Sequence, residues 1–247
     1  MTPPAHTFRA PRARAAALGA ALLSMFAAPP ESRASAPAAD VSDPVALYGD
    51  EIRFDVLRNG VDAGFHTVRF AKAEDGLRVA ATFQLEVQFL FFTAFRYVYR
   101  SEALWRDGGL ARLDVAIDDG GTASSLHAVA KGGRLFVTAP DAAFDTDAGL
   151  LPTNHWNAGV LTQDRVLNTL TGRVNQVRIE PQGDDAVSTE QGTVQATRFR
   201  YTGDLDTEVW YDNHGRWVKM RFTGRDGSTI DYVCRRCQGP STKGAGQ

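Results

Sequence analysis

The chain has 247 residues, a formal net charge of −2 at pH 7 and a hydrophobic content of 43%. Basic residues are not in excess, as they would be in a nucleic-acid-binding domain, so a nucleic-acid partner is not expected. Once the N-terminal region described next is set aside, about two hundred residues remain, which is enough for one β-rich domain with a sizeable core.

The first 36 residues have the layout of a secretory signal peptide. Arg9, Arg12 and Arg14 form a cationic start, an apolar run follows over residues 15–28, and small residues then offer cleavage sites between residues 34 and 38. The apolar run is shorter than the roughly 20 residues that a spanning helix needs, so we expect cleavage rather than anchoring. The sequence therefore predicts an exported protein, periplasmic or secreted, with no transmembrane segment after cleavage.

Residues 45–237 predict a single antiparallel β domain, because alternating runs and turn residues follow one another along the chain. Asn59-Gly60 separates two such runs, which is the strongest short-range signal for a β-hairpin. The run over residues 79–89 places six apolar residues on one face and polar residues opposite, as in a half-buried strand. Its length favours a highly curved sheet. We therefore predict an all-β fold, a curved antiparallel meander that forms a partly closed barrel.

One segment departs from the alternation. Residues 158–171 carry apolar residues at helical spacing, and Gly172 follows where a helix would stop, so we predict one short helix there. The preceding segment, PTNHW, is expected to be an irregular loop. At the other end of the chain, residues 238–247 lack apolar residues and are predicted to be a disordered tail.

The two cysteines of the chain, Cys234 and Cys237, lie at the end of the last predicted strand. In an exported protein such a pair is most often oxidised, so we predict a local disulfide. A thiol-redox site and half of a metal site remain as alternatives. Haem attachment is not expected, because Gln238 follows the second cysteine where a histidine would be needed.

Signals for catalysis and cofactors are few. His155 would serve as a general base if Asp145 or Asp164 oriented it, but no nucleophile motif such as G-x-S-x-G accompanies it. No histidine has a partner at metal-ligand spacing, and neither a phosphate-cradling glycine motif nor a dinucleotide fingerprint is present. We therefore predict no catalytic residue, no metal and no cofactor, and we interpret Trp156 as a plug at an open end of the sheet.

Aromatic side chains are expected to gather on the concave face of the sheet. We predict that this face binds a hydrophobic molecule, or else that the same side chains fill the interior completely, as they do in small barrels. Phe91 and Phe92 are adjacent, so on an extended strand one of them would leave the core unless the chain kinks. The predicted ligand-binding residues are Phe83, Phe89, Phe95, Tyr97, Tyr99, Trp105, His155 and Trp156.

The order of several segments resembles a known family. The segments are RNGVDAGFHTVRF, FLFFTAFRYVYRSEALWRDG, NHW, QDRVLNTLTG and ATRFRYTGDLDTEVWYDNHGRWVKMRFTGRDGSTIDY. From about Tyr48 to Tyr232 they resemble a bacterial exported family, number 6134 in the domain-of-unknown-function series, and the closing hairpins are similar to family 3108. At the level of fold, the WYDNHGRW hairpin is also similar to periplasmic outer-membrane lipoprotein carriers, whose unclosed barrel holds acyl chains. The resemblance implies an exported antiparallel β protein and no particular activity.

Three functional hypotheses follow. The first is a non-enzymatic periplasmic protein that binds a lipid or another hydrophobic molecule in the concave face of its sheet. The second is an envelope structural or protein-interaction module with a solid core and an envelope protein as its partner. The third is a hydrolase or isomerase that uses His155.

Overall fold

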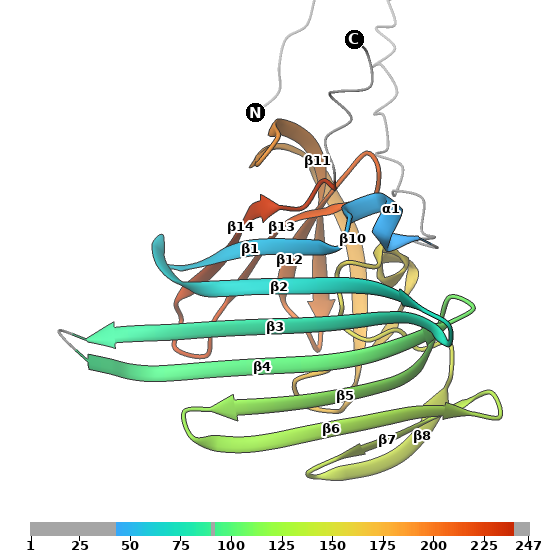
Figure 1. Cartoon of the computed structure of the whole chain (residues 1–247). Helices are drawn as coiled ribbons and strands as arrows, with labels where there is room; N and C mark the ends of the chain where they lie inside the picture. Colours follow the sequence, from blue (N-terminus) through green and yellow to red (C-terminus); the bar gives the residue numbers. More distant parts are fainter. Residues whose placement is uncertain (1–42, 90–91, 240–247) are drawn as a thin grey trace, which may run out of the picture. The chain divides into compact units, whose positions relative to one another are not determined.

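The structure is a computed structural model that describes residues 43–89 and 92–239. The predicted signal peptide and residues 240–247 lie outside this part of the chain. The expectation for Phe91 and Phe92 also falls outside it, because Phe91 and the side chain of Phe92 are not described. What is described consists almost wholly of β-strands and the turns between them (Figure 1).

The described residues form two short helical segments and fourteen strands. The helical segments are α1 (Pro44–Tyr48) and the 3-10 helix η1 (Ala158–Thr162). The strands are β1 (Glu51–Arg58), β2 (Val61–Ala73), β3 (Gly76–Phe89), β4 (Phe92–Arg106), β5 (Gly109–Asp119), β6 (Thr122–Lys131), β7 (Arg134–Ala139), β8 (Ala142–Asp147), β9 (Arg165–Leu167), β10 (Val174–Thr189), β11 (Gly192–Gly203), β12 (Thr207–Asp212), β13 (Trp217–Thr223) and β14 (Thr229–Arg236).

All the strands belong to one antiparallel sheet, in the order β8-β7-β6-β5-β4-β3-β2-β1-β14-β13-β12-β11-β10-β9. The first strand pairs with the last, with Val56 opposite Tyr232, so the two ends of the domain meet in the middle of the sheet. Within the described residues β8 and β9 remain separate edges, and the sheet is therefore not closed. The predicted all-β fold, a curved antiparallel meander forming a partly closed barrel, is confirmed.

The sheet curves so that its two halves face each other. We call β1–β8 the first wall and β9–β14 the second wall. In Figure 1 the first wall runs across the front of the molecule, and β10 to β13 descend behind it at a steep angle. Register shifts interrupt the ladder at several places, including Val87/Gln88 in β3 and Pro181/Asp184 in β10. Such shifts add local twist and bend, which allows long strands to wrap around a core.

Two glycines near the start of the domain have distinct roles, one in the first hairpin turn and one between β2 and β3. Asn59 and Gly60 have φ values of 50° and 80°, the left-handed conformation that a two-residue hairpin turn requires, so the predicted turn is confirmed. Gly64 lies on β2 opposite Leu85 of β3. A Cβ atom at Gly64 would stand 1.9 Å from the carbonyl oxygen of Gln84, so glycine alone permits this close approach of the two strands.

The helix predicted over residues 158–171 is much shorter in the structure. The 3-10 helix ends at Thr162, and Arg165–Leu167 is instead the edge strand β9, paired with the start of β10. Asn168 then accepts hydrogen bonds from the backbone N–H groups of Leu170 and Thr171 and holds a tight turn. Val166 and Leu167, which contributed to the helical pattern of the sequence, are fully buried as residues of this edge strand.

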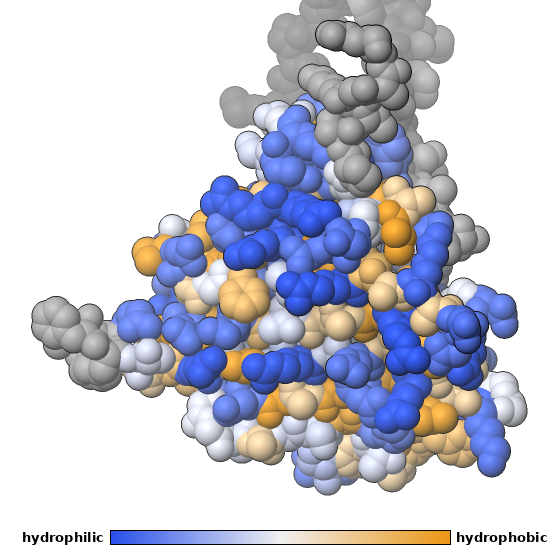
Figure 2. All heavy atoms as spheres, in the orientation of Figure 1, coloured by the Kyte–Doolittle hydropathy of each residue, from blue (hydrophilic) through white to orange (hydrophobic). Residues whose placement is uncertain are grey.

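The outer face of the walls is polar. Alternate strand residues that point away from the interior carry charges and form cross-strand ion pairs, such as Arg69 with Glu51 at 2.8 Å and Arg221 with Asp231 at 2.6 Å. Figure 2 shows hydrophilic residues over most of the face seen in Figure 1, with apolar residues in scattered patches. The alternation of the sequence thus separates a polar exterior from an apolar interior.

Candidate functional site

A cavity of about 740 Å³ lies between the two walls of the sheet. Strands β2 to β4 line it from the first wall, and β13 and β14 line it from the second. Two parts of the segment between β8 and β10, residues 153–156 and 168–170, also reach it. Most of the lining side chains are apolar or aromatic, because the alternate residues of these strands that face inward are apolar. The interior is therefore not completely filled by side chains.

The first wall supplies most of the aromatic residues that the sequence singled out. The structure places four of them in the lining of the cavity, and the exposed fraction falls from 39% at Phe95 to 5% at Tyr99. Trp105 does not line the cavity: it lies farther along β4, with its ring 5.2 Å from the ring of Trp156. The side chain of Phe89 lies outside the described residues. The lining residues from this prediction are Phe83, Phe95, Tyr97 and Tyr99.

The second wall completes the cavity with residues that the sequence reasoning missed. Met220 and Phe222 alternate along β13, and Ile230 and Tyr232 alternate along β14, so this signal was available in the sequence, although Trp217 does not continue the alternation. The alternation alone does not indicate which pair of strands faces β3 across the interior. Phe83 of the first wall now stacks on Tyr232 of the second wall, with ring centroids 5.9 Å apart. The lining residues from the second wall include Trp217, Met220, Phe222, Ile230 and Tyr232.

The loop that carries His155 and Trp156 lies inside the curved sheet and is held there through its backbone. The hydroxyl of Tyr48 donates to the carbonyl of Trp156 at 3.0 Å, and that of Tyr211 donates to the carbonyl of His155 at 2.7 Å. The Trp156 ring packs edge-on against Phe70, with centroids 5.4 Å apart. Both residues line the cavity while being almost wholly buried, so the loop forms part of its inner wall.

His155 has no acidic partner. No ion pair of the described residues includes it, and Asp145, one of the two carboxylates that would have oriented it, pairs with Arg134 instead. Burial lowers the pKa of His155 to about 4, so the ring is neutral at pH 7. Within the described part of the chain, its Nδ1 atom has no hydrogen-bond partner. The geometry thus lacks the base–orienter pair that general-base catalysis would use.

A second histidine, His66, also lines the cavity. Its Nδ1 atom lies 3.4 Å from the hydroxyl oxygen of Tyr232. The rings of His66 and His155 both lie 5.5 Å from the ring of Trp217, centroid to centroid. Burial, and then the proximity of His155, lowers the pKa of His66 to about 3. The inner part of the cavity therefore carries polar groups without a net charge.

Charged residues gather at the mouth of the cavity. Arg58 pairs with Asp226 at 2.6 Å, and Arg225 pairs with Asp119. Hydrogen bonds from Ser228 and then from Arg58 hold the pKa of Asp226 well below its usual range. The lining also includes Asp206, which pairs at 3.0 Å with Arg200, a residue outside the lining.

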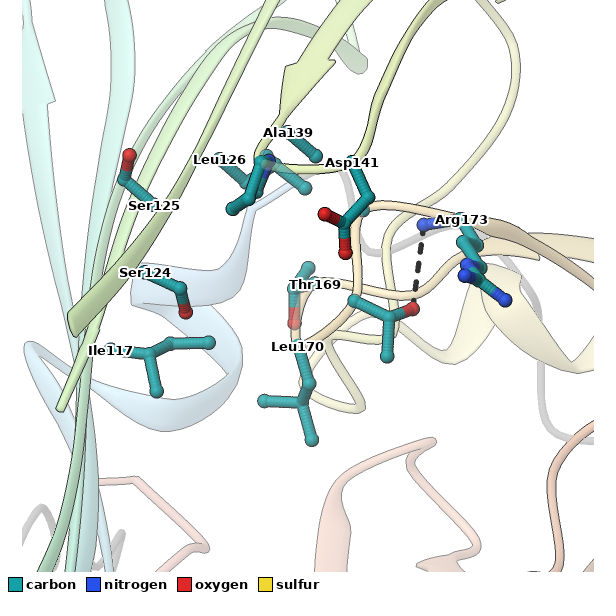
Figure 3. A pocket seen from close by; sticks show the side chains of 12 residues that line it. Ile117, Ser124, Ser125, Leu126, Ala139, Asp141, Thr169, Leu170 and Arg173 are labelled. Carbon is teal, nitrogen blue, oxygen red and sulfur yellow. Dashed lines mark hydrogen bonds between the residues drawn. The ribbon is translucent and has the colours of Figure 1, made fainter. Parts of the chain in front are cut away.

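A smaller pocket of about 320 Å³ lies beside the large cavity (Figure 3). The strands β5 and β6 form one side of it, and residues 169–173 form the other. Thr169 and Leu170 line both this pocket and the large cavity, so the turn held by Asn168 separates the two spaces. Leu170 is 55% exposed at the edge between them.

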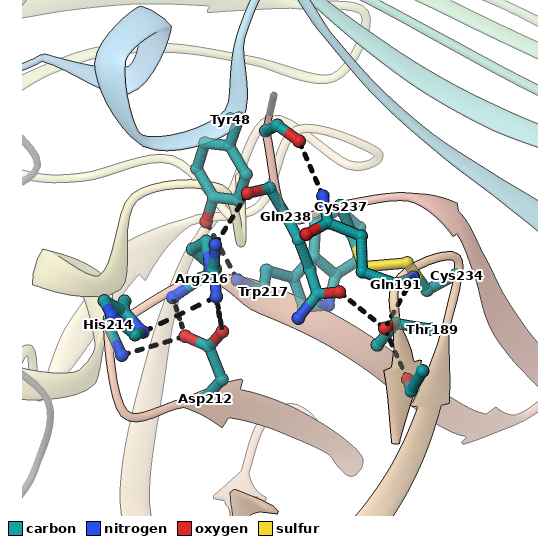
Figure 4. Close-up of polar contacts among 12 residues, drawn as sticks. Tyr48, Thr189, Gln191, Asp212, His214, Arg216, Trp217, Cys234, Cys237 and Gln238 are labelled. Atoms are coloured by element: carbon teal, nitrogen blue, oxygen red, sulfur yellow. Dashed lines mark hydrogen bonds and ion pairs between the residues drawn. A yellow bond between two sulfur atoms is a disulfide. The ribbon is translucent and has the colours of Figure 1, made fainter. Parts of the chain in front are cut away.

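The C-terminal residues of the domain dock on the hairpin between β10 and β11 (Figure 4). The sulfur atoms of Cys234 and Cys237 lie at disulfide-bonding distance, as predicted. The carboxylate of Glu190 accepts hydrogen bonds from the backbone N–H groups of Cys237 and Gln238, both at 3.0 Å. The sequence predicts Gln238 in the disordered tail, but the residue is buried, and its carbonyl accepts a 2.6 Å hydrogen bond from Arg216.

Glu190 and the two cysteines also form the one group among the described residues whose ligand atoms lie close enough together to hold a metal ion. The two sulfurs are bonded to each other, so neither is available as the thiolate that a metal would need. Neither cysteine lines the large cavity. This group is therefore a structural contact of the C-terminal end, separate from the cavity.

Similarity to known proteins extends over most of the described residues. The model of the family described as Domain of unknown function (DUF6134) matches residues 54–235. A solved structure, a beta-barrel-like protein of the domain of unknown function DUF1849 from Brucella abortus, is similar with a TM-score of 0.54 at 12% identity. The similarity covers 77% of this chain and 97% of the other, and at this identity it shows the fold alone. No curated protein matches the chain. In the described residues, no helix is long and apolar enough to cross a membrane.

Proposed function

The chain belongs to the DUF6134 family, and from the cavity in its curved sheet we propose that it is an exported, non-enzymatic protein that holds a lipid or another hydrophobic molecule. The single observation that carries the proposal is the open space of about 740 Å³ between two apolar walls. Ligand pockets are typically of about 300–1,000 Å³ and combine apolar walls with a few polar groups. The cavity has this size and composition.

The apolar lining favours occupation of the cavity. An unfilled apolar space leaves the side chains around it without packing partners, which costs stability unless a molecule occupies it. Each Å² of apolar ligand surface that enters such a space contributes about 25 cal/mol. A hydrophobic molecule therefore gains free energy by entering the cavity, and the walls gain the contacts that they lack.

Export is part of the proposal. Its support is the cationic start and apolar run of the first 36 residues, together with two cysteines placed to form a disulfide. The fold-level similarity to periplasmic lipoprotein carriers, and the relation of the closing hairpins to family 3108, are consistent with a periplasmic location. Both remain expectations from the sequence.

The two other hypotheses have less support. A hydrolase or isomerase based on His155 would need a partner to orient that histidine, and none is present among the described residues. A solid-core interaction module would need a filled interior, whereas a large cavity is present. Within the described residues the outer edge of β8 is unpaired, and an unpaired edge is where a strand of a partner protein would add to the sheet.

Native mass spectrometry tests the proposal on protein recovered from the envelope of its own cells. We expect a population whose mass exceeds that of the polypeptide by that of a small molecule, which is released on denaturation. An organic extract of the same sample then identifies the molecule. If the protein carries no added mass and also fails to bind the neutral fluorescent probe N-phenyl-1-naphthylamine, the proposal is wrong.

A further inference from the structure

We propose that the molecule held in the cavity is uncharged, an apolar chain or ring system without an ionised headgroup. The inference rests on the function proposed above and narrows it to one chemical class. Two features of the lining carry it: the pairing of the charges at the mouth and the neutral interior.

Among the described residues, the mouth offers no unpaired cation to an anionic headgroup. The lining contains two arginines, Arg58 and Arg225, and each is paired with a carboxylate of the lining. The third carboxylate of the lining, Asp206, is paired with Arg200, which lies just outside the lining. A carboxylate or phosphate at the mouth would therefore have to displace an existing partner of an arginine. Both arginines are therefore already paired and do not form a binding site for an anionic headgroup.

The interior is equally unsuited to a charged group. No Lys, Arg, Asp or Glu of the described lining lies on β3 or β4, and His66 and His155 are both neutral at pH 7. Moving an ion into such surroundings without a partner costs far more free energy than a hydrogen bond returns. The part of the ligand that enters the cavity must therefore be uncharged.

Competition for N-phenyl-1-naphthylamine tests the inference with ligands of equal chain length. Decan-1-ol and decanoate are titrated at pH 7.5 into the complex of the full-length mature protein with the probe. We expect decanol to displace the probe at a concentration at least about tenfold lower than decanoate, because only the alcohol enters without carrying a charge. If decanoate competes as well as decanol or better, the inference is wrong while the proposed function stands. If the probe itself does not bind saturably, both fail.

Two variants test whether the ion pairs at the mouth cause the preference for decanol over decanoate. Asp119→Asn removes the partner of Arg225, so the ratio of decanoate to decanol affinity should rise about two- to fivefold, as expected for an exposed charge pair. The matched control is Asp114→Asn, another β5 aspartate that pairs with an arginine, Arg112. Asp114 lies outside the cavity lining, so this variant should leave the ratio of the two affinities unchanged. Equal ratios in the two variants would show that Arg225 is not masked by Asp119, against the inference.

Discussion

The hydroxyl of Tyr211, on β12 of the second wall, donates a 2.7 Å hydrogen bond to the backbone carbonyl of His155. Both groups are buried, and 56 residues separate them in the sequence. This contact fixes the loop between β8 and β9 inside the sheet and thereby sets the depth of the cavity. The wall of the candidate site thus depends on a tyrosine that does not itself line the cavity.

Tyr211→Phe should therefore destabilise the protein. The change leaves the His155 carbonyl buried without its donor, and such losses cost about 1–3 kcal/mol of the free energy of unfolding. Tyr201→Phe is the matched control, because among the described residues the buried Tyr201 hydroxyl has no partner, and its removal should be neutral or slightly stabilising. Urea unfolding followed by tryptophan fluorescence measures both. Equal losses in the two variants would contradict this account of the loop.

Acidification should weaken the fold through His155. The folded-state pKa of about 4 lies below the usual value of 6.5, so between these pH values the unfolded chain binds more protons than the folded one. The contribution of His155 to stability is thus complete above pH 6.5, falls as the pH drops towards 4, and amounts to roughly 3 kcal/mol in total. Free energies of unfolding across pH 4–7 should show a smaller slope in His155→Gln. A slope in His155→Gln equal to that of wild type would contradict this role of His155.

Gly64→Ala should be strongly destabilising. The added Cβ would lie 1.9 Å from the Gln84 carbonyl oxygen, so β2 and β3 would have to separate, at a cost of about 3 kcal/mol or more. At Gly109 the nearest atom to an added methyl group would be 3.6 Å away, an ordinary contact. Gly109→Ala should therefore change the melting temperature little. A melting temperature of Gly64→Ala indistinguishable from that of wild type would mean that the strands do not approach this closely.

Loss of the Cys234–Cys237 bond should affect stability modestly and ligand binding not at all. A bond across so short a loop restricts the unfolded chain little, so replacing both cysteines by serine should cost about 2 kcal/mol or less. Neither cysteine lines the cavity, and the affinity for N-phenyl-1-naphthylamine should stay at the wild-type value. Thiol titration before and after denaturation checks that the wild-type pair is oxidised. A large fall in probe affinity in the double variant would show that the C-terminal end shapes the cavity.

The sequence predicted those features that arise from local chemistry. The Asn59-Gly60 turn needs only its two residues, and the inward face of β3 follows from alternation around Phe83. The prediction of a helix over residues 158–171 was wrong beyond Thr162. Buried residues in a short strand, followed by a turn, also place apolar residues three or four positions apart. Val166 and Leu167 are extended in β9, and the side chain of Asn168 stabilises the turn that follows.

Long-range pairing was not accessible in the same way. Nothing local in β1 indicates that Val56 lies opposite Tyr232, which is 176 positions later, yet this pairing brings the second wall to the cavity. The same limit explains Trp105, which shares a strand face with Tyr97 but lies behind Trp156 instead of in the lining. A single sequence assigns residues to a face, whereas the curvature of the sheet decides which part of that face remains open.

The central claim is that the cavity binds a hydrophobic molecule, and filling the cavity tests it most directly. Val87 is half-buried and lines the cavity from β3, whereas Thr82 lies on the opposite face of the same strand. Val87→Trp and Thr82→Trp therefore add the same indole group inside and outside the cavity. In a fluorescence titration with N-phenyl-1-naphthylamine, we expect saturable binding to wild type and Thr82→Trp, and at least about tenfold weaker binding to a folded Val87→Trp. Equal affinity in the two variants, or no saturable binding to wild type, would contradict the account.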